Sequence, residues 1–340
     1  METEKYMRRC LDLARQGEYY VAPNPMVGAV LVGSDGQILG EGHTSPYGGP
    51  HAEVNAFNDF HRRHSDLSDA ESCDLLHDAT LYVSLEPCSH YGKTPPCADR
   101  VIREGVGHVV VGCLDPNPLV AGRGVGKLRD AGIEVETGLL ERECRYLNRR
   151  FICLHEKHRP YVVLKWAQTA DGFLAPMPTR EGEEQRLVIS TPLTRQLVHK
   201  MRAENMAIMV GTNTVVKDNP RLLNTHWCGR NPIRVVLDRH HRLDPNSRVF
   251  SDDAATIVYS DNTEWQFILS DLARRNIHSV LVEGGAELLH TIIASDVFDE
   301  VHVEVGQMKI GEGVAAPRMD LSAFQCTRID GNRLYEYIRC

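Results

Sequence analysis

Three potential metal ligands, one His and two Cys, accompany an acidic residue in the first third of the chain. His51-Ala52-Glu53 opens a predicted helix, and Cys88 and Cys97 follow a predicted strand. One imidazole and two thiolates suit tetrahedral Zn²⁺, and three protein ligands leave a fourth position for water. Zinc lowers the pKa of such a water, and Glu53 is close enough in sequence to take its proton and pass it to a leaving amine. The pattern predicts a catalytic zinc site.

The order of these residues, apart from the spacing of the two cysteines, indicates a deaminase. His-x-Glu followed by Pro-Cys-x-x-Cys is the signature of zinc nucleobase deaminases, but here eight residues separate Cys88 from Cys97. The alternative is a structural zinc site, which would need a fourth ligand and would not need Glu53. His90 is the available fourth ligand. We interpret it as a substrate contact instead, because the loop around it is open and polar.

Composition excludes several classes of protein. The chain has 340 residues, of which 42% are hydrophobic and 25% charged, and its formal charge is −8. These fractions are typical of folded globular proteins, and the acidic balance argues against a nucleic-acid-binding face. No run of apolar residues is long enough to span a membrane, and the N-terminus does not resemble a signal peptide. We expect a cytoplasmic protein whose ten cysteines are thiols or metal ligands.

Strands and helices alternate along the chain, which predicts an α/β fold. Residues 61–78 are polar and patternless, and we interpret them as a surface insertion. In the first part, helices are expected over 7–14 and 51–60, a hairpin over 27–32 and 37–41, and strands over 80–84, 108–113 and 133–137.

A charged stretch over 155–160 marks the expected domain boundary. We predict a first domain over 1–150, a linker over 151–160 and a second domain over 161–340. Thr191 and Pro192 are expected to begin a helix. Strands are expected over 161–166, 206–211, 233–238, 256–260 and 279–283, with a helix around Trp265.

Longer motifs resemble one deaminase family. They are Asn24-Pro25-Met26-Val27-Gly28, Gly49-Pro50 before His51, the Gly92-Lys93-Thr94-Pro95-Pro96 loop before Cys97, and residues 115–124. These motifs are similar to those of the bifunctional pyrimidine deaminase/reductase of riboflavin biosynthesis. The resemblance implies a cytidine-deaminase-like three-layer domain that removes the 2-amino group of 2,5-diamino-6-ribosylamino-4(3H)-pyrimidinone 5′-phosphate. It also implies that His51, Cys88 and Cys97 bind zinc and that Glu53 shuttles protons.

Four polar side chains near these motifs are predicted to bind the substrate. The Asn24 amide could hold the pyrimidine edge through paired hydrogen bonds. His43, His90 and Lys93 could meet polar or phosphate groups. Ordinary loop polarity is the alternative interpretation for each of them.

The second half is less informative by itself, because it shows no second metal cluster and no Ser–His–acid set. Its two strand–turn–helix junctions, Val210–Thr214 and Val282–Ala286, could each bind an anion at a helix N-terminus. The Gly284-Gly285 turn equally fits a tight connection without a ligand.

Residues 165–172, 201–203, 211–220 and 282–285 resemble the reductase half of the same family. The resemblance implies a dihydrofolate-reductase-like domain that uses NADPH to reduce the ribosyl group to ribityl. By position, Ala167, Thr214, Asp218, Gly284 and Gly285 would face NADPH, and Arg202, Leu222 and Glu283 would face the substrate.

Two segments depart from the family pattern. Arg186-Leu187-Val188-Ile189-Ser190 replaces a segment that often contains Ser-x-Trp-Ile, and Leu222-Leu223-Asn224-Thr225 lacks the arginine that commonly ends this motif. An arginine suits a substrate phosphate, so Arg202, Arg221 or Arg186 could take that role here.

The sequence therefore predicts a bifunctional enzyme that acts on a small pyrimidine ribosyl phosphate and uses Zn²⁺ and NADPH, with neither nucleic acid nor membrane as a partner. The family resemblance also makes a homo-oligomer plausible. One alternative is a deaminase whose second domain is only a binding or assembly module. Another is a nucleic-acid deaminase of the tRNA-editing type, which the acidic charge and the long loop between the cysteines oppose.

Overall fold

The chain folds into two compact units, Met1–His158 and Arg159–Cys340. The computed structural model describes residues 3–91, 95–117, 120–177 and 187–339. Each unit has its own sheet and its own hydrophobic core, so each is described separately.

The sheet of the first unit has the strand order β2-β1-β3-β4-β5. β1 pairs antiparallel with β2 and β3, whereas β3, β4 and β5 run parallel. The carboxyl ends of β3 and β4 therefore lie at the same edge of the sheet as the start of β1 and the end of β2. The strands are β1 (Gly28–Val32), β2 (Ile38–His43), β3 (Thr80–Leu85), β4 (His108–Cys113) and β5 (Glu134–Thr137).

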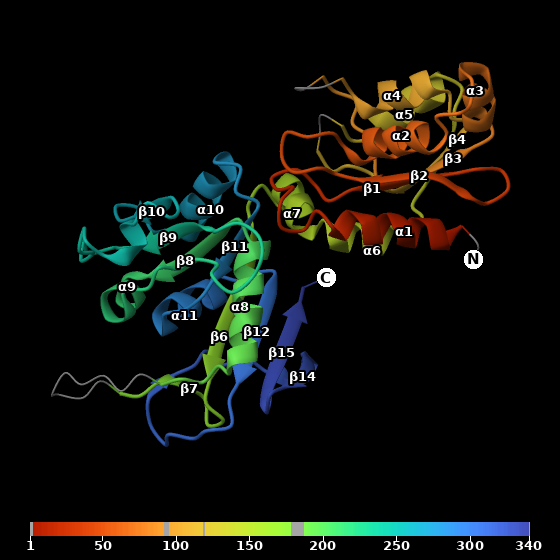
Figure 1. The fold of residues 1–340 in the computed structure, drawn as a ribbon. Coiled ribbons are helices and arrows are strands. Elements are labelled where there is room, and N and C mark those ends of the chain that lie inside the picture. Colours follow the sequence, from red (N-terminus) through yellow and green to blue (C-terminus); the bar gives the residue numbers. More distant parts are fainter. Residues whose placement is uncertain (1–2, 92–94, 118–119, 178–186, 340) are drawn as a thin grey trace. The chain divides into compact units, whose positions relative to one another are not determined.

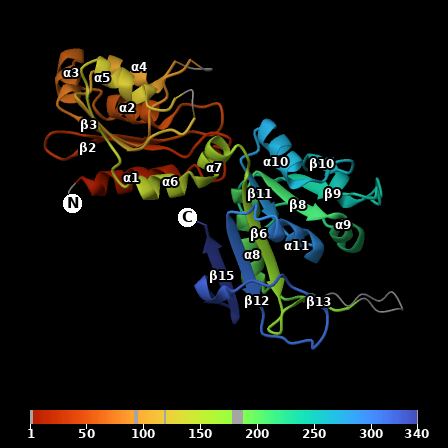
Figure 2. The same ribbon diagram turned by 180° about the vertical axis from the view of Figure 1, so that it is seen from behind.

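Helices cover both faces of this sheet. α1 (Glu4–Arg15) and α6 (Glu141–Leu147) lie on one face, and α2 (Ala52–Arg63), α4 (Cys97–Glu104) and α5 (Arg123–Asp130) lie on the other (Figure 1, Figure 2). The result is the three-layer arrangement that was expected for the first domain.

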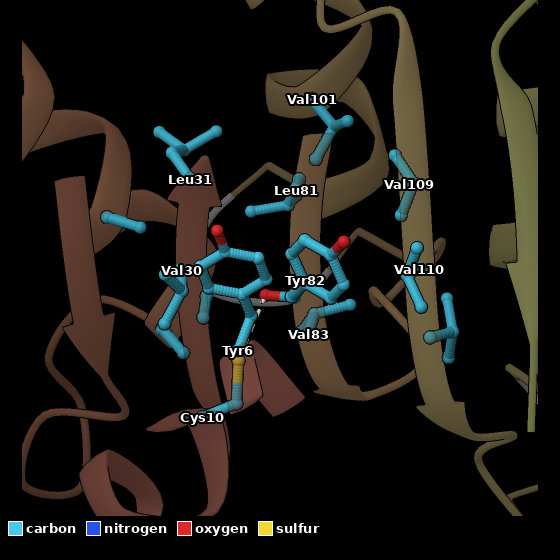
Figure 3. Packing of buried hydrophobic residues seen from close by; sticks show 14 of the residues in the cluster. Tyr6, Cys10, Val30, Leu31, Leu81, Tyr82, Val83, Val101, Val109 and Val110 are labelled. Carbon is cyan, nitrogen blue, oxygen red and sulfur yellow. Dashed lines mark hydrogen bonds between the residues drawn. The ribbon is translucent and has the colours of Figure 1, made fainter. Parts of the chain in front are cut away.

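The core beneath α1 is tightly packed. Tyr6 and Cys10 of α1 point towards Tyr82 on β3 (Figure 3), and the Cys10 thiol donates a hydrogen bond to the Tyr82 carbonyl at 3.3 Å. A side chain at Gly28 would place its Cβ 1.9 Å from the Cys10 carbonyl oxygen. The helix backbone can approach β1 this closely only because residue 28 is glycine.

Residues 61–78 differ from the expected patternless insertion, because they contain α3 (Asp69–His77). Ser68 and Glu71 form a capping box at its start. This helix buries a single residue, Leu76, so the sequence shows no repeating pattern of hydrophobic residues that would predict the helix. The Ser-x-x-Glu spacing was the available evidence for this helix.

The segment expected as a linker over 151–160 is mostly helical. α7 (Arg149–Lys157) buries Ile152 and Cys153, and Phe151 packs against the core of the first unit. Of the charged residues that suggested a linker, Glu156 and Lys157 are exposed in the last turn of this amphipathic helix, and Arg159 follows the helix and pairs with Asp299. The contact boundary falls between His158 and Arg159.

The main sheet of the second unit has the order β10-β9-β8-β11-β6-β12-β15-β14. The strands from β10 to β12 in this order run parallel, and β15 and β14 are antiparallel additions. β7 (Phe173–Ala175) and β13 (Val314–Ala315) form a separate pair. The main strands are β6 (Tyr161–Gln168), β8 (Ala207–Gly211), β9 (Ile233–Leu237), β10 (Thr256–Tyr259), β11 (Ser279–Val282), β12 (Glu300–Val305), β14 (Gln325–Ile329) and β15 (Asn332–Ile338).

The two faces of this sheet carry different residues. α10 (Trp265–Arg274) and α11 (Ala286–Ala294) share a hydrophobic cluster with Val162 and Leu164 of β6. Successive side chains of a strand alternate between faces, so Lys165 and Ala167 lie on the opposite face. α8 (Pro192–Glu204) lies on that face. At its start, the Thr194 hydroxyl donates a hydrogen bond to Glu304 of β12. α9 (Thr212–Asp218) also packs there.

We expect Gly28→Ala to lower the free energy of unfolding of the first unit by about 1–3 kcal/mol, because the added methyl group overpacks the α1–β1 contact. Hydrogen exchange of the β1 and β3 amides, measured by mass spectrometry, would report this loss separately from the second unit. Gly126→Ala is the matched control. Among the described residues, no atom outside the backbone of its own helix lies within 4 Å of the Gly126 Cβ position, and protection equal to or above wild type is expected.

Candidate functional site

His51, Cys88 and Cys97 meet at one edge of the first unit's sheet. His51 is the N-cap residue of α2, Cys97 is the first residue of α4, and Cys88 lies in the loop after β3. The His51 Nδ1 atom lies 3.3 Å from the Cys97 sulfur and 3.7 Å from the Cys88 sulfur. Tetrahedral zinc with ordinary bond lengths separates such N and S ligands by about 3.6 Å. The donor set and its spacing therefore fit zinc.

The charges of this trio also favour a cation. A hydrogen bond from the Cys97 thiol, aided by His51, lowers the pKa of Cys88 to about 4. The pKa of Cys97 is instead held well above its ordinary value by that hydrogen bond and by burial. Without a cation, the site stabilises the thiolate form of Cys88 and disfavours the thiolate form of Cys97. A divalent cation removes this restriction, because it stabilises both thiolates.

Glu53 lies beside the trio. It is the second residue of α2, its side chain is buried, and its charge lies close enough to Cys88 and His51 to interact with both. Burial and the Cys88 thiolate raise the pKa of the Glu53 carboxyl to about 7. A carboxyl group poised near neutrality suits proton transfer in both directions.

The other predicted deaminase residues occupy the same edge of the sheet to different degrees. Asn24 precedes β1 and His43 ends β2, where it pairs with Gly28 of β1. Asn24 and His43 are half-buried, and His90 is exposed. Among the described residues, His90 is outside the group of ligand atoms that lie within 4.8 Å of one another, which leaves the trio open. Lys93 lies outside the described residues.

Sequence reasoning missed Asp115. This residue follows β4, is buried, and accepts a hydrogen bond from the Asn117 amide at 2.8 Å. Burial raises its pKa to about 6, and its charge lies close enough to interact with Cys88 and His90. Its place after a buried strand at the edge that carries Cys88 was the available signal.

The second unit gathers another set of charged groups at the carboxyl edge of its parallel strands. Arg202 of α8 donates two hydrogen bonds to Glu283, at 2.7 and 2.6 Å, and Glu283 follows β11. The structure thus joins two of the predicted substrate contacts in one bidentate ion pair. Despite burial, the Arg202 charge keeps the pKa of Glu283 below its ordinary value.

Lys165 is a second residue that sequence reasoning did not single out. Its ammonium makes no ion pair or hydrogen bond with the residues that the structure describes, yet it lies close enough to Glu283 and Glu304 to feel both charges. Burial lowers its pKa. Lys165 lies within β6, one residue past the level at which the neighbouring strand β11 ends. A desolvated lysine beside a carboxylate at such an edge is typical of a functional group.

Four of the five predicted cofactor residues lie at the same edge of the sheet. Gly284 and Gly285 adopt φ values of +122° and +78° immediately before α11, and the Cβ position of Gly284 is open. The Thr214 hydroxyl lies 3.5 Å from the Cβ position of Gly285, so the two predicted junctions meet. Ala167 lies near the end of β6, whereas Asp218 is exposed at the end of α9. In general, a glycine turn before a helix can present backbone amides to a phosphate group.

The segment without the expected arginine is held by α8. Leu222 is buried with a φ of +55°. Arg202 donates to the Leu223 carbonyl at 2.8 Å, and the Thr225 amide donates to His199 Nδ1 at 3.1 Å. Arg202 is thus already paired, and Arg221 pairs with Asp253. Arg186, the third predicted phosphate partner, lies outside the described residues.

The second unit also contains a group that the sequence did not indicate. Glu300, His302 and Glu336 place their ligand atoms within 4.8 Å of one another. His302 Nε2 lies 2.6 Å from Glu300 Oε1. This hydrogen bond accounts for the proximity of the pair without a metal ion.

Comparison with known proteins decides the family. Residues 160–337 match the family model of the RibD C-terminal domain, and residues 1–113 match the cytidine and deoxycytidylate deaminase zinc-binding region. The chain is 37% identical over 334 residues to riboflavin biosynthesis protein RibD of Aquifex aeolicus, covering 92% of this chain and 89% of that protein. This chain belongs to the RibD family. It is therefore a bifunctional deaminase and reductase of riboflavin biosynthesis.

Other RibD proteins agree. The chain is 39% identical over 339 residues to RibD of Synechocystis, covering 92% of this chain and 86% of that protein. It matches the structure of a diaminohydroxyphosphoribosylaminopyrimidine deaminase/5-amino-6-(5-phosphoribosylamino)uracil reductase from Thermotoga maritima with a TM-score of 0.85 and 38% identity, covering 100% and 99% of the two chains. The RibD match confirms the predicted family and fold class, and it excludes a second domain that serves only for binding.

In the part of this RibD-family chain that the structure describes, no helix is long and apolar enough to cross a bilayer.

We expect Cys97→Ser to reduce bound zinc from about one ion per chain to a small fraction after dialysis against a mild chelator, because a hydroxyl group is a poorer ligand than a thiolate. Elemental analysis measures the metal. Cys73→Ser, which changes an exposed cysteine on α3, should retain the wild-type zinc content. Full zinc occupancy in the Cys97→Ser protein would contradict the assignment.

Proposed function

We propose that the first unit hydrolyses the 2-amino group of 2,5-diamino-6-ribosylamino-4(3H)-pyrimidinone 5′-phosphate. The observation that carries this proposal is the His51–Cys88–Cys97 trio with the buried Glu53 carboxyl beside it. When bound by the trio, zinc lowers the pKa of a coordinated water towards neutrality. The match to a zinc-binding deaminase region supports the same conclusion.

Glu53 performs the proton transfers in this proposal. Its carboxylate takes a proton from the attacking water as the new C–O bond forms at C2 of the pyrimidine. It then gives that proton to the 2-amino group, and the C–N bond breaks to release ammonia. Asn24 and His43 orient the ring from the same sheet edge, and His90 and Lys93 are proposed to contact its polar and phosphate groups.

Glu53→Gln should lower the deamination rate by about 10²–10⁴-fold, because the amide cannot shuttle protons. Zinc content should remain at the wild-type level, since Glu53 is not a proposed ligand. Ammonia release from the diaminopyrimidinone substrate gives the rate, and NADPH oxidation with the deaminated compound serves as a control in the same protein. Wild-type ammonia release would remove Glu53 from the mechanism.

For the second unit, we propose NADPH-dependent reduction of the ribosyl group to ribityl. NADPH supplies a hydride, which reduces C1′ of the opened sugar. The open Gly284-Gly285 turn beside Thr214 supports cofactor binding at this edge, and Ala167 and Asp218 are proposed to complete it. Arg202, Leu222 and Glu283 are proposed to face the substrate.

Lys165 is proposed to move a proton during this reduction. As the sugar ring opens, the bond between C1′ and the ring oxygen breaks, and that oxygen must gain a proton. The Lys165 ammonium can donate it because burial lowers its pKa. The Arg202–Glu283 pair fixes the Glu283 carboxylate near Lys165 and keeps the ammonium oriented at the sheet edge.

Lys165→Met should reduce NADPH oxidation by about 100-fold or more while leaving ammonia release unchanged, because the side chain keeps its length and loses its proton. Lys200→Met on α8 is the control, since Lys200 pairs at the surface with Glu204. Both rates can be followed in one cuvette. An unchanged reduction rate in the Lys165 variant would contradict this role.

We also propose a cytoplasmic location. We propose in addition a homo-oligomer, which the family resemblance supports. Sedimentation of the purified zinc-loaded protein tests the oligomer. The formal charge of −8 supports a small-molecule substrate over nucleic acid.

A further inference from the structure

Glu86 occupies an unusual position between β3 and Cys88. Its side chain is buried, and its two carboxylate oxygens accept four backbone hydrogen bonds. One oxygen accepts from the amides of Asp115 and Gly122 at 3.2 and 2.9 Å. The other accepts from Gly124 and Val125 at 2.9 and 3.1 Å. All four donors are main-chain groups, so the carboxylate organises backbone.

These donors belong to the segment that follows β4. Gly122 is the N-cap residue of α5, and Gly124 and Val125 lie in its first turn. A carboxylate is favoured there because it accepts the amides that have no partner within the helix. Glu86 therefore joins the start of α5 to the loop that carries Cys88. Its amide also donates to the Cys113 carbonyl at 3.0 Å, which fixes it to the end of β4.

The backbone contact next to Glu86 is equally close. A Cβ atom at Gly124 would lie 2.0 Å from the Pro87 carbonyl oxygen. The first turn of α5 thus rests directly on the residue before Cys88, and only glycine permits this approach.

The segment held in this way brings Asp115 to the deaminase site. The backbone amide of Asp115 is one of the four that donate to Glu86. The carboxyl group of Asp115 lies close enough to Cys88 and His90 to interact with their charges. Without the Glu86 carboxylate, the Asp115 amide and the start of α5 would lose a shared anchor. The distance from Asp115 to the metal trio would then vary.

We propose that Glu86 is a positioning residue for deamination, which holds Asp115 and the start of α5 against the Cys88 loop and so sets the affinity for the pyrimidine substrate. The inference rests on the proposed deamination. In this proposal Glu86 neither binds the metal nor transfers a proton during deamination, because both of its carboxylate oxygens accept hydrogen bonds from backbone amides.

The test uses Glu86→Gln in the full-length, zinc-loaded protein. The new amide group would face backbone N–H donors in place of one oxygen, so about half of the hydrogen bonds are lost. We expect the KM for deamination to rise about tenfold or more. The kcat should stay within about threefold of wild type, and zinc content and the reduction rate should be unchanged.

Gly124→Ala is the second variant, because it leaves the carboxylate in place and displaces the start of α5 from Pro87. It should raise the KM for deamination in the same way. Gly126→Ala on the same helix should not, since no described atom beyond the helix's own backbone lies within 4 Å of its Cβ position. If the Glu86→Gln protein fails to fold, the KM of the Gly124→Ala protein for deamination tests the proposal: a raised KM supports it and a wild-type KM overturns it.

Loss of zinc, or a fall in kcat with unchanged KM, in these variants would overturn the proposal.

Hydrogen exchange distinguishes a failure of the anchoring role of Glu86 from a failure of the proposed deaminase function. If the wild-type protein does not deaminate this substrate, the proposed function fails. The amides of Gly122, Gly124 and Val125 should still exchange faster in Glu86→Gln than in wild type, and wild-type protection of these amides would refute the anchoring role itself.

Discussion

The first unit depends on how charge is accommodated where His51, Cys88, Cys97 and Glu53 are buried together. Desolvation and the mutual repulsion of negative groups allow one thiolate and oppose the second, as the opposite shifts of the two cysteine pKa values show. A divalent cation removes this conflict and at the same time favours the ionised Glu53 carboxylate. The same burial opposes a second thiolate and raises the pKa of Glu53, so the preference of the trio for a cation and the proton transfer proposed for Glu53 have one physical origin.

Parallel strands explain why each site lies where it does. In the first unit, β3 and β4 end at one edge, and the segments that follow them supply Cys88 and Asp115. In the second unit, β6, β8 and β11 end together and supply Ala167, the α9 junction and Glu283. Each edge also carries helix N-termini, those of α2 and α4 in the first unit and those of α9 and α11 in the second. The two chemistries therefore share an architectural principle, although only the first has a recognisable ligand motif.

Buried carboxylates hold both edges in place. Glu86 collects backbone amides in the first unit, and in the second unit Glu304 accepts hydrogen bonds from Ser190, Thr194 and Asn332 at 2.5–2.7 Å. A buried carboxylate is costly unless its lone pairs are filled, and a fully satisfied one fixes several segments at once. Glu304 lies opposite Ala167 on β12, so this network places the start of α8 over the strand that carries Lys165.

The sequence by itself determined the deaminase motif, the family, the two α/β domains and most strands. His51, Glu53 and Cys88 are informative because their chemistry is tied to short spacing. Lys165, Asp115 and Glu86 were not predicted as functional groups, since a single lysine or acid after a strand has no distinctive pattern until its burial and partners are known. α3 and α7 were missed because polar composition concealed a capping box in one and an amphipathic face in the other. The Arg202–Glu283 pair joins residues 81 positions apart. Only the tertiary structure could decide such contacts, because burial and long-range proximity, rather than residue type, set the charge and hydrogen bonding of these groups.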